Sequence, residues 1–169
     1  MLRAAFLFIA CTFVAAGTTA QVDFSIVRLD GIGPVRVGMN LSELNKVLHT
    51  SFKSPTDPDE QACTYVEMPH QSGIAVMILD GRVARVDVDN TSTRTAEGIH
   101  NGDSEARAVQ VYGKRLKIEP NHYDPENGHY LTLSSPDRKY GIRFESDNGK
   151  ITRYYAGTSN AIAFVEGCS

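Results

Sequence analysis

The sequence has no tryptophan, only three cysteines and no run of basic residues. A chain without a basic block or stripe lacks the electrostatic pattern of proteins that bind nucleic acid or anionic membranes. After residue 20, no apolar stretch is long enough to span a bilayer as a helix. No cluster of residues has the pattern of a catalytic, metal or cofactor site. These absences favour a binding protein over an enzyme.

Residues 1–20 have the pattern of a secretory signal peptide. Arg3 precedes an apolar stretch over residues 4–16, and residues 18–20 end in the small side chains that a signal peptidase requires. The sequence therefore predicts cleavage after Ala20, a single mature domain over residues 21–169, and a periplasmic or secreted location. A second interpretation is a lipoprotein anchored through Cys11, because Phe8–Cys11 loosely fits the lipidation pattern.

Two cysteines, Cys63 and Cys168, remain after this cleavage. An even pair in an oxidising compartment indicates a disulfide. Because the closed loop is long, the chain-entropy model gives such a bond about 4–5 kcal/mol of stabilisation. The bond would also fasten the penultimate residue, at an end of the chain that is otherwise prone to fraying.

One β-hairpin pattern occurs twice. Residues 73–86 contain two β-rich arms around Asp80-Gly81, and residues 141–154, at an offset of 68 positions, repeat the pattern around Asn148-Gly149. Asp-Gly and Asn-Gly between such arms are the strongest short-range hairpin signal, because these turns require positive φ angles.

A helix pattern precedes each hairpin. Asn40 and Ser104 are good N-cap residues, and they introduce predicted helices over residues 41–48 and 105–112. We expect a loop over 51–61, strands over 63–68, 129–133 and 161–165, and an edge strand within 21–29. The sequence thus predicts an α+β fold of tandem α-β-β-β repeats, approximately 31–90 and 98–157, with a mostly antiparallel sheet, short helices on one face and a C-terminal strand.

The segments 37–40 and 102–104, together with the two hairpins, resemble the tandem fold of the β-lactamase-inhibitory protein family and the small outer-membrane lipoprotein modules of the β-barrel assembly machinery. The resemblance implies the repeat architecture. Inhibitors of that family have a disulfide in each repeat and several tryptophans, which this chain lacks, so β-lactamase inhibition is not carried over. The segments 63–65, 80–83 and 166–168 are also similar to exported bacterial proteins of unknown role, some of which are labelled lectins.

Strand alternation predicts a core face and an outer face on each hairpin. The second hairpin places Ile142, Phe144 and Ile151 in the core, and the offset predicts the same for Ile74, Val76, Ile78 and Val83. The opposite face of the first hairpin is also apolar, with Ala75, Met77, Leu79, Ala84, Val86 and Val88. Either another segment covers it, such as residues 21–29 or a loop, or it is a patch for a protein partner, centred on Met77 and Val86 and flanked by Tyr65 and Tyr154.

A different class of function is a lectin-like site for a glycan or small ligand, in which Tyr65, His122, Asp124 and Tyr130 make the contacts. The Gly-Asp-Ser at 102–104 is reminiscent of a hydrolase nucleophile. None of the five histidines follows an aspartate by three residues, however, so the partner element of such hydrolases is missing. We therefore interpret Ser104 as a helix cap. Arg85 and Arg153 occupy the same place in the two hairpins and are interpreted as structural arginines, each paired with a carboxylate on a neighbouring strand.

The leader and the disulfide predict the mass of the secreted protein. Protein purified from the periplasm should begin at Gln21, and reduction should add one hydrogen for each of Cys63 and Cys168. Intact mass spectrometry with and without reductant measures both. Free thiols in the native protein would exclude the bond, and a lipid mass on Cys11 would exclude cleavage after Ala20.

Overall fold

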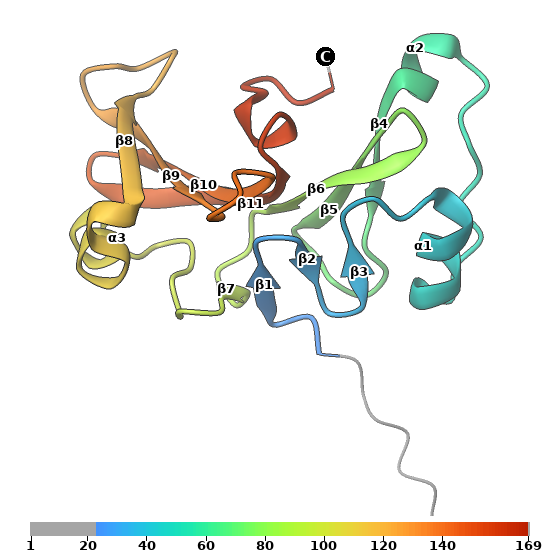
Figure 1. The fold of residues 1–169 in the computed structure, drawn as a ribbon, viewed down its shortest axis with the longest axis horizontal. Coiled ribbons are helices and arrows are strands. Elements are labelled where there is room, and N and C mark those ends of the chain that lie inside the picture. Colours follow the sequence, from blue (N-terminus) through green and yellow to red (C-terminus); the bar gives the residue numbers. More distant parts are fainter. Residues whose placement is uncertain (1–22, 169) are drawn as a thin grey trace, which may run out of the picture.

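The computed structural model describes residues 23–168 (Figure 1). The predicted signal peptide, its cleavage after Ala20 and the alternative lipidation of Cys11 lie outside the described residues. The elements are β1 (Ile26–Arg28), β2 (Gly31–Ile32), β3 (Val35–Arg36), α1 (Leu41–Leu48), α2 (Pro58–Ala62), β4 (Cys63–Glu67), β5 (Ile74–Leu79), β6 (Arg82–Val88), β7 (Arg94–Thr95), α3 (Glu105–Tyr112), the 3₁₀ turn η1 (Gly113–Arg115), β8 (Leu116–Pro120), β9 (Gly128–Ser134), β10 (Tyr140–Asp147), β11 (Lys150–Thr158) and the 3₁₀ turn η2 (Ala161–Ala163).

A seven-stranded antiparallel sheet forms the body of the molecule, in the order β4-β5-β6-β11-β10-β9-β8. The two predicted hairpins are β5–β6 and β10–β11, and they meet at the centre, where β6 pairs with β11. Asp80 and Gly81 have φ angles of 49° and 74°, and Asn148 and Gly149 have 47° and 75°. Both turns thus use the positive φ angles that their sequences predict.

The helices begin where the sequence predicts. The Asn40 side chain accepts a hydrogen bond from the backbone N–H of Glu43 and forms a full capping box, and the Ser104 side chain accepts from the N–H of Arg107. The segment that precedes each of these two helices also forms a backbone hydrogen bond to one of the hairpins. Gly38 N–H donates to the carbonyl of Val83, and Gly102 N–H donates to that of Ile151, each at 2.7 Å.

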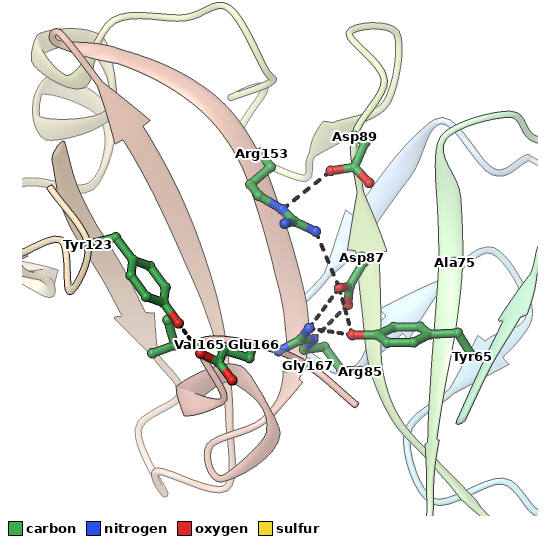
Figure 2. A pocket seen from close by; sticks show the side chains of 10 residues that line it. All are labelled: Tyr65, Ala75, Arg85, Asp87, Asp89, Tyr123, Arg153, Val165, Glu166 and Gly167. Carbon is green, nitrogen blue, oxygen red and sulfur yellow. Dashed lines mark hydrogen bonds and ion pairs between the residues drawn. The ribbon is translucent and has the colours of Figure 1, made fainter. Parts of the chain in front are cut away.

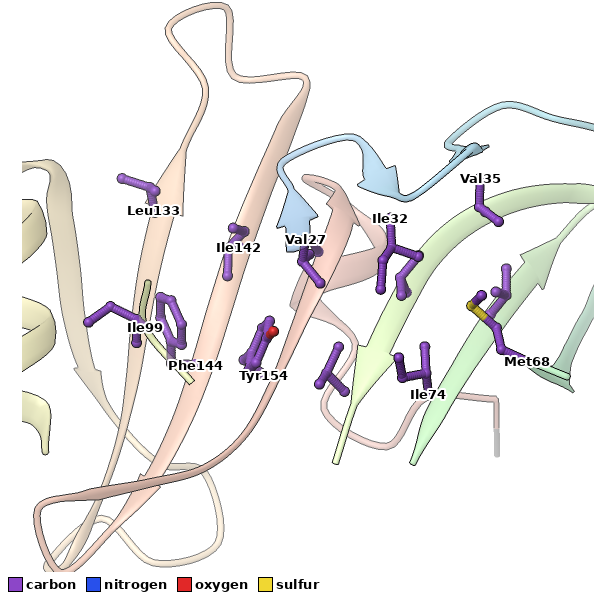
Figure 3. Close-up of a cluster of buried hydrophobic side chains, with 14 of the residues drawn as sticks. Val27, Ile32, Val35, Met68, Ile74, Ile99, Leu133, Ile142, Phe144 and Tyr154 are labelled. Atoms are coloured by element: carbon purple, nitrogen blue, oxygen red, sulfur yellow. The ribbon is translucent and has the colours of Figure 1, made fainter. Parts of the chain in front are cut away.

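The main core lies between the large sheet and a layer formed by α1, α3 and a small sheet of order β3-β2-β1-β7 (Figures 1 and 3). Val27, Ile32 and Val35 of the small sheet are fully buried. They belong to one cluster with side chains of the large sheet, among them Ile74 and Tyr154. The strand predicted within residues 21–29 is therefore β1, and it covers the inner face of the large sheet. It is not the predicted edge strand, because it lies between β2 and β7 in the small sheet.

The α+β class and the mostly antiparallel sheets are confirmed, and three details differ from the prediction. Part of the predicted loop over 51–61 is helix α2, which begins at Pro58 after the N-cap Asp57. The predicted strand over 161–165 is wrong, because η2 bends the chain there and the carbonyls of Ala161 and Phe164 bond to a side chain instead of to a strand.

The third difference concerns the faces of the hairpins. The pairing of each hairpin shifts register once and leaves one extra residue on its second strand. Met77 pairs with Arg85 and Ile78 with Val83, so Ala84 of β6 is extra. At the equivalent place, Thr152 of β11 is extra. Such a β-bulge reverses which side chains face the core beyond it. Residues placed on the outer face by simple alternation, Val86, Val88 and Tyr154, therefore lie in the main core.

Within residues 23–168, no helix has the length and apolarity needed to cross a membrane.

The buried tyrosines of the core predict opposite effects of the same mutation. The Tyr154 hydroxyl is buried and has no hydrogen-bond partner among residues 23–168, whereas the Tyr112 hydroxyl bonds Thr95 at 2.7 Å and Glu97 at 3.2 Å. Tyr154→Phe should raise the free energy of unfolding by about 1 kcal/mol, and Tyr112→Phe should lower it by about 1 kcal/mol. Urea unfolding of both variants measures the difference, and a loss of stability in Tyr154→Phe would contradict it.

Candidate functional site

The C-terminal segment, residues 159–168, crosses the outer face of the large sheet, opposite the main core (Figure 1). It forms a second, smaller apolar cluster in which Ala161 packs with Met77 and Ala84. Cys168 at its end forms the predicted disulfide with Cys63 of β4, with the two Cα atoms 5.3 Å apart. The segment is thus held against the first hairpin.

This cover corrects the predicted protein-binding patch. Met77, Val86 and Tyr154 are all fully buried, at 0 % exposure. Met77 lies under the C-terminal segment, and the other two face the main core because of the β-bulges. The apolar face is covered, but by residues 159–168 and not by residues 21–29. Binding of a protein partner stays a prediction, without this surface to support it.

Arg85 binds the C-terminal segment from the outer face of the large sheet through hydrogen bonds. This β6 side chain is 2 % exposed. Its Nε and Nη2 atoms donate to the two carboxylate oxygens of Asp87 at 2.6 and 2.8 Å. Nη1 donates to the carbonyls of Ala161 and Phe164 at 2.9 and 3.0 Å, and Nη2 also donates to the Tyr65 hydroxyl at 2.6 Å. All five N–H groups of the guanidinium are therefore used.

The surroundings of Arg85 keep its guanidinium charged. Burial alone would lower the pKa of Arg85, but hydrogen bonds to Asp87 and the charge of that carboxylate raise it. Burial, followed by the Asp87 charge, raises the pKa of Tyr65 to about 12. The guanidinium also lies over the ring of Tyr155, 4.3 Å from its centroid. Tyr65 is therefore a neutral hydroxyl near neutral pH, and the Arg85–Asp87 pair is a closed ionic unit.

A cavity of about 390 Å³ opens beside this unit, between the sheet and the C-terminal segment (Figure 2). Its size is in the range of small-molecule sites. Charged and tyrosine side chains dominate its wall. The lining residues are Tyr65, Ala75, Arg85, Asp87, Asp89, Tyr123, Arg153, Val165, Glu166 and Gly167.

Arg153 of β11 reaches into this cavity across the β6–β11 seam. Its Nη2 lies 3.9 Å from Asp87, and its Nε lies 3.4 Å from Asp89. The Nε atom is buried and makes no hydrogen bond within residues 23–168. The side chain as a whole is 41 % exposed. Unlike Arg85, Arg153 makes no side-chain hydrogen bond within residues 23–168, so the N–H groups of its guanidinium other than the buried Nε–H can donate to a ligand.

Tyr123 and Glu166 form the opposite side of the cavity (Figure 2). Tyr123 comes from the loop between β8 and β9, and its hydroxyl donates to the Glu166 carboxylate of the C-terminal segment. This hydrogen bond, followed by desolvation, raises the pKa of Tyr123. Next to Glu166, Gly167 has a φ angle of 69°, and a Cβ there would lie 2.7 Å from the Tyr65 hydroxyl. The glycine therefore allows the segment to approach β4 closely.

The residues predicted for a ligand site separate into two groups. Tyr65 lines the cavity. The other three, His122, Asp124 and Tyr130, do not line it, but they hold the loop that carries Tyr123. The His122 ring contacts the Tyr123 ring, its backbone N–H donates to the Tyr130 hydroxyl, and Asp124 accepts from the N–H of Asn127.

Most of the residues that line the cavity are not predicted from the sequence. Arg85 and Arg153 were noticed, but as structural residues, whereas Asp87, Asp89, Tyr123 and Glu166 were not singled out. One signal was present, because Arg85, Asp87 and Asp89 alternate with Val86 and Val88 along β6. Three charged residues at a period of two indicate a polar face on a strand whose other face is core.

Ser104 and the residues near it do not form a nucleophilic triad. The Ser104 hydroxyl caps α3. Nearby, Ser146 and the Nδ1 atom of His129 both contact the carboxylate of Glu105, the latter at 2.9 Å. The Glu105 carboxylate thus lies between the serine and the imidazole. In a catalytic triad, by contrast, the imidazole bonds the serine directly. This cluster fastens α3 to β9 and β10.

Elsewhere in the fold, the candidate sites are less complete. A second cavity of about 330 Å³ lies between α1 and β4, and its wall is mostly apolar, with Lys53 its one charged residue. Within residues 23–168, no group of three or more His, Cys, Asp or Glu side chains is placed to hold a metal ion. The polar cavity beneath the C-terminal segment has the richer set of converging groups.

The Arg85–Asp87 unit predicts unequal roles for the two hairpin arginines. Arg85→Met should lower the free energy of unfolding by about 3–5 kcal/mol, because it leaves Asp87 buried without its partner. Arg153→Met is the matched control and should cost less than about 1 kcal/mol, because this side chain is partly exposed. Urea unfolding with the disulfide intact measures both. Equal losses in the two variants would show that the Arg85 network does not hold the segment.

Comparison of the chain with protein-family models, with curated proteins and with solved structures finds no match.

Proposed function

We propose that this protein is an exported, non-catalytic binding protein whose polar cavity takes a saccharide. The observation that carries the proposal is the cavity itself. Besides the closed Arg85–Asp87 pair, one guanidinium, two carboxylates and two tyrosine hydroxyls converge there, and they belong to Arg153, Asp89, Glu166, Tyr65 and Tyr123. Sugar hydroxyl groups both donate and accept hydrogen bonds, so they need a wall that offers both capacities. Arg153 donates, and Asp89 and Glu166 accept. The hydroxyl protons of Tyr65 and Tyr123 are already donated to Asp87 and Glu166, so these two tyrosines can only accept.

The rigidity of the wall supports binding. Arg85 fixes the C-terminal segment at two carbonyls, and the disulfide fixes it at Cys168. Residues 165–167, which line the cavity, lie between these anchors. A wall held in place before the ligand arrives loses little conformational entropy on binding, which favours affinity.

We further propose that residues 31–90 and 98–157 are two copies of one unit. Equivalent hydrogen bonds join Gly38 to Val83 and Gly102 to Ile151, and both hairpins carry a β-bulge at the same place. Tyr65 lies opposite Met77 in the first unit, and Tyr130 lies opposite Glu145, 68 positions after Met77, in the second. In this arrangement the cavity lies at the seam between the copies.

Export is supported by the leader pattern of residues 1–20 and by the Cys63–Cys168 disulfide, since structural disulfides persist in oxidising compartments. In that setting the ligand would be an extracellular or cell-envelope saccharide.

A glycan array followed by calorimetry tests the proposal. The wild-type protein should bind a defined subset of glycans, and Arg153→Met should weaken that binding at least about tenfold, because hydrogen bonds to a charged group contribute about 1.5–3 kcal/mol. Arg143→Met is the matched control. Arg143 lies on the same face but packs over Tyr130, outside the cavity.

The control should bind like the wild-type protein. Absence of binding to every glycan on the array would contradict the proposal, as would equal effects of the two arginine variants. Release of reducing ends from a bound glycan, abolished by Glu166→Gln, would instead identify an enzyme.

A further inference from the structure

The cavity has more acidic than basic side chains. Five charged residues line it, of which Arg85 and Arg153 are basic and Asp87, Asp89 and Glu166 are acidic. The Arg85–Asp87 pair is closed, because every N–H of that guanidinium already has a partner within the protein. The ligand therefore meets the charges of Arg153, Asp89 and Glu166.

The charge of Arg153 is already balanced. Its guanidinium lies near two carboxylates, Asp87 at 3.9 Å and Asp89 at 3.4 Å. An anionic ligand would have to compete with both of them for this cation. The cavity consequently offers poor conditions for an acidic sugar, a phosphate or a sulfate.

Glu166 is the carboxylate without a cation. Its hydrogen bond comes from the neutral Tyr123 hydroxyl, and within residues 23–168 no ion pair includes it. The same hydrogen bond raises the pKa of Tyr123, so this hydroxyl stays neutral near neutral pH and supplies no compensating charge. Glu166 is an exposed residue at the wall of the cavity, and a carboxylate is a strong acceptor for a cationic donor.

Resting on the proposed function, we propose that the saccharide is an amino sugar whose protonated primary amine binds at Glu166. Its ammonium group would donate to the Glu166 carboxylate, while neighbouring hydroxyl groups accept from Arg153 and donate to Asp89. The ammonium group is a compact cation with several N–H donors, and it supplies the positive charge that this side of the cavity lacks.

Calorimetry with three trimers of one linkage tests this proposal. The sugars are glucosamine, N-acetylglucosamine and glucose, which present an ammonium, a neutral amide and a neutral hydroxyl at the same position. Near neutral pH, the glucosamine trimer should bind at least about tenfold more tightly than the other two, as a charge-assisted hydrogen bond requires.

Variants and pH locate the origin of this preference. Glu166→Gln should bring the three affinities to the same value while keeping an acceptor for Tyr123. Glu126→Gln, an exposed carboxylate on the loop that carries Tyr123, should keep the preference. Raising the pH above the pKa of the sugar amine should abolish the preference and leave the affinity for the glucose trimer unchanged.

The outcomes separate the two proposals. Equal affinity for the three trimers, or tighter binding of an acidic sugar, would overturn the amino-sugar proposal and leave saccharide binding intact. A preference that survives Glu166→Gln would also overturn it. Absence of binding to these trimers and to every glycan on the array would overturn both.

Discussion

The bidentate ion pair between Arg85 and Asp87 joins three parts of the molecule that are far apart in the sequence. It lies on β6 at the centre of the large sheet, reaches β4 through Tyr65, and reaches the C-terminal segment through two carbonyls. A buried ion pair is tolerated only where the remaining donors and acceptors are satisfied, because desolvation of both charges is costly. Here that requirement determines where the C-terminal segment must lie.

The disulfide and the ion pair restrict the C-terminal segment in different ways. The disulfide limits how far Cys168 can move from β4, but it does not choose the path of the residues before it. The hydrogen bonds from Arg85 to Ala161 and Phe164 choose that path. Only residues 165–167 remain between the two restraints, and all three line the cavity. Glu166 is thus held at a defined place by contacts on either side of it.

Local sequence signals predicted the elements well, and long-range contacts explain what they missed. The Asp80-Gly81 and Asn148-Gly149 turns, and the Asn40 and Ser104 caps, depend on the backbone within a few residues, so the sequence contains the information. The outward position of Tyr154 was wrong because a single β-bulge changes the facing of the strand beyond it, and nothing in the local alternation identifies the bulge.

The cavity could not be predicted, because its wall combines residues from 65 to 167 that only the folded sheet and its C-terminal cover bring together. The partial signal was the alternation of Arg85, Asp87 and Asp89 along β6. This alternation indicated a polar face on β6, but it did not indicate which segment of the chain would lie over that face. The predicted ligand residues His122, Asp124 and Tyr130 were close in the fold, since they hold the loop of Tyr123.

The two hairpin arginines show how similar local sequences take different roles. Two residues after Arg85 stands Asp87, and two residues after Arg153 stands Tyr155. Arg85 therefore has a carboxylate partner on its own strand, whereas Arg153 must reach across the seam to Asp87 of β6 and to Asp89, which follows the end of that strand. Tyr155 in turn packs its ring beneath the Arg85 guanidinium. One side chain difference thus makes the first arginine a saturated structural group, whereas the second is held by two ion pairs and makes no side-chain hydrogen bond within residues 23–168.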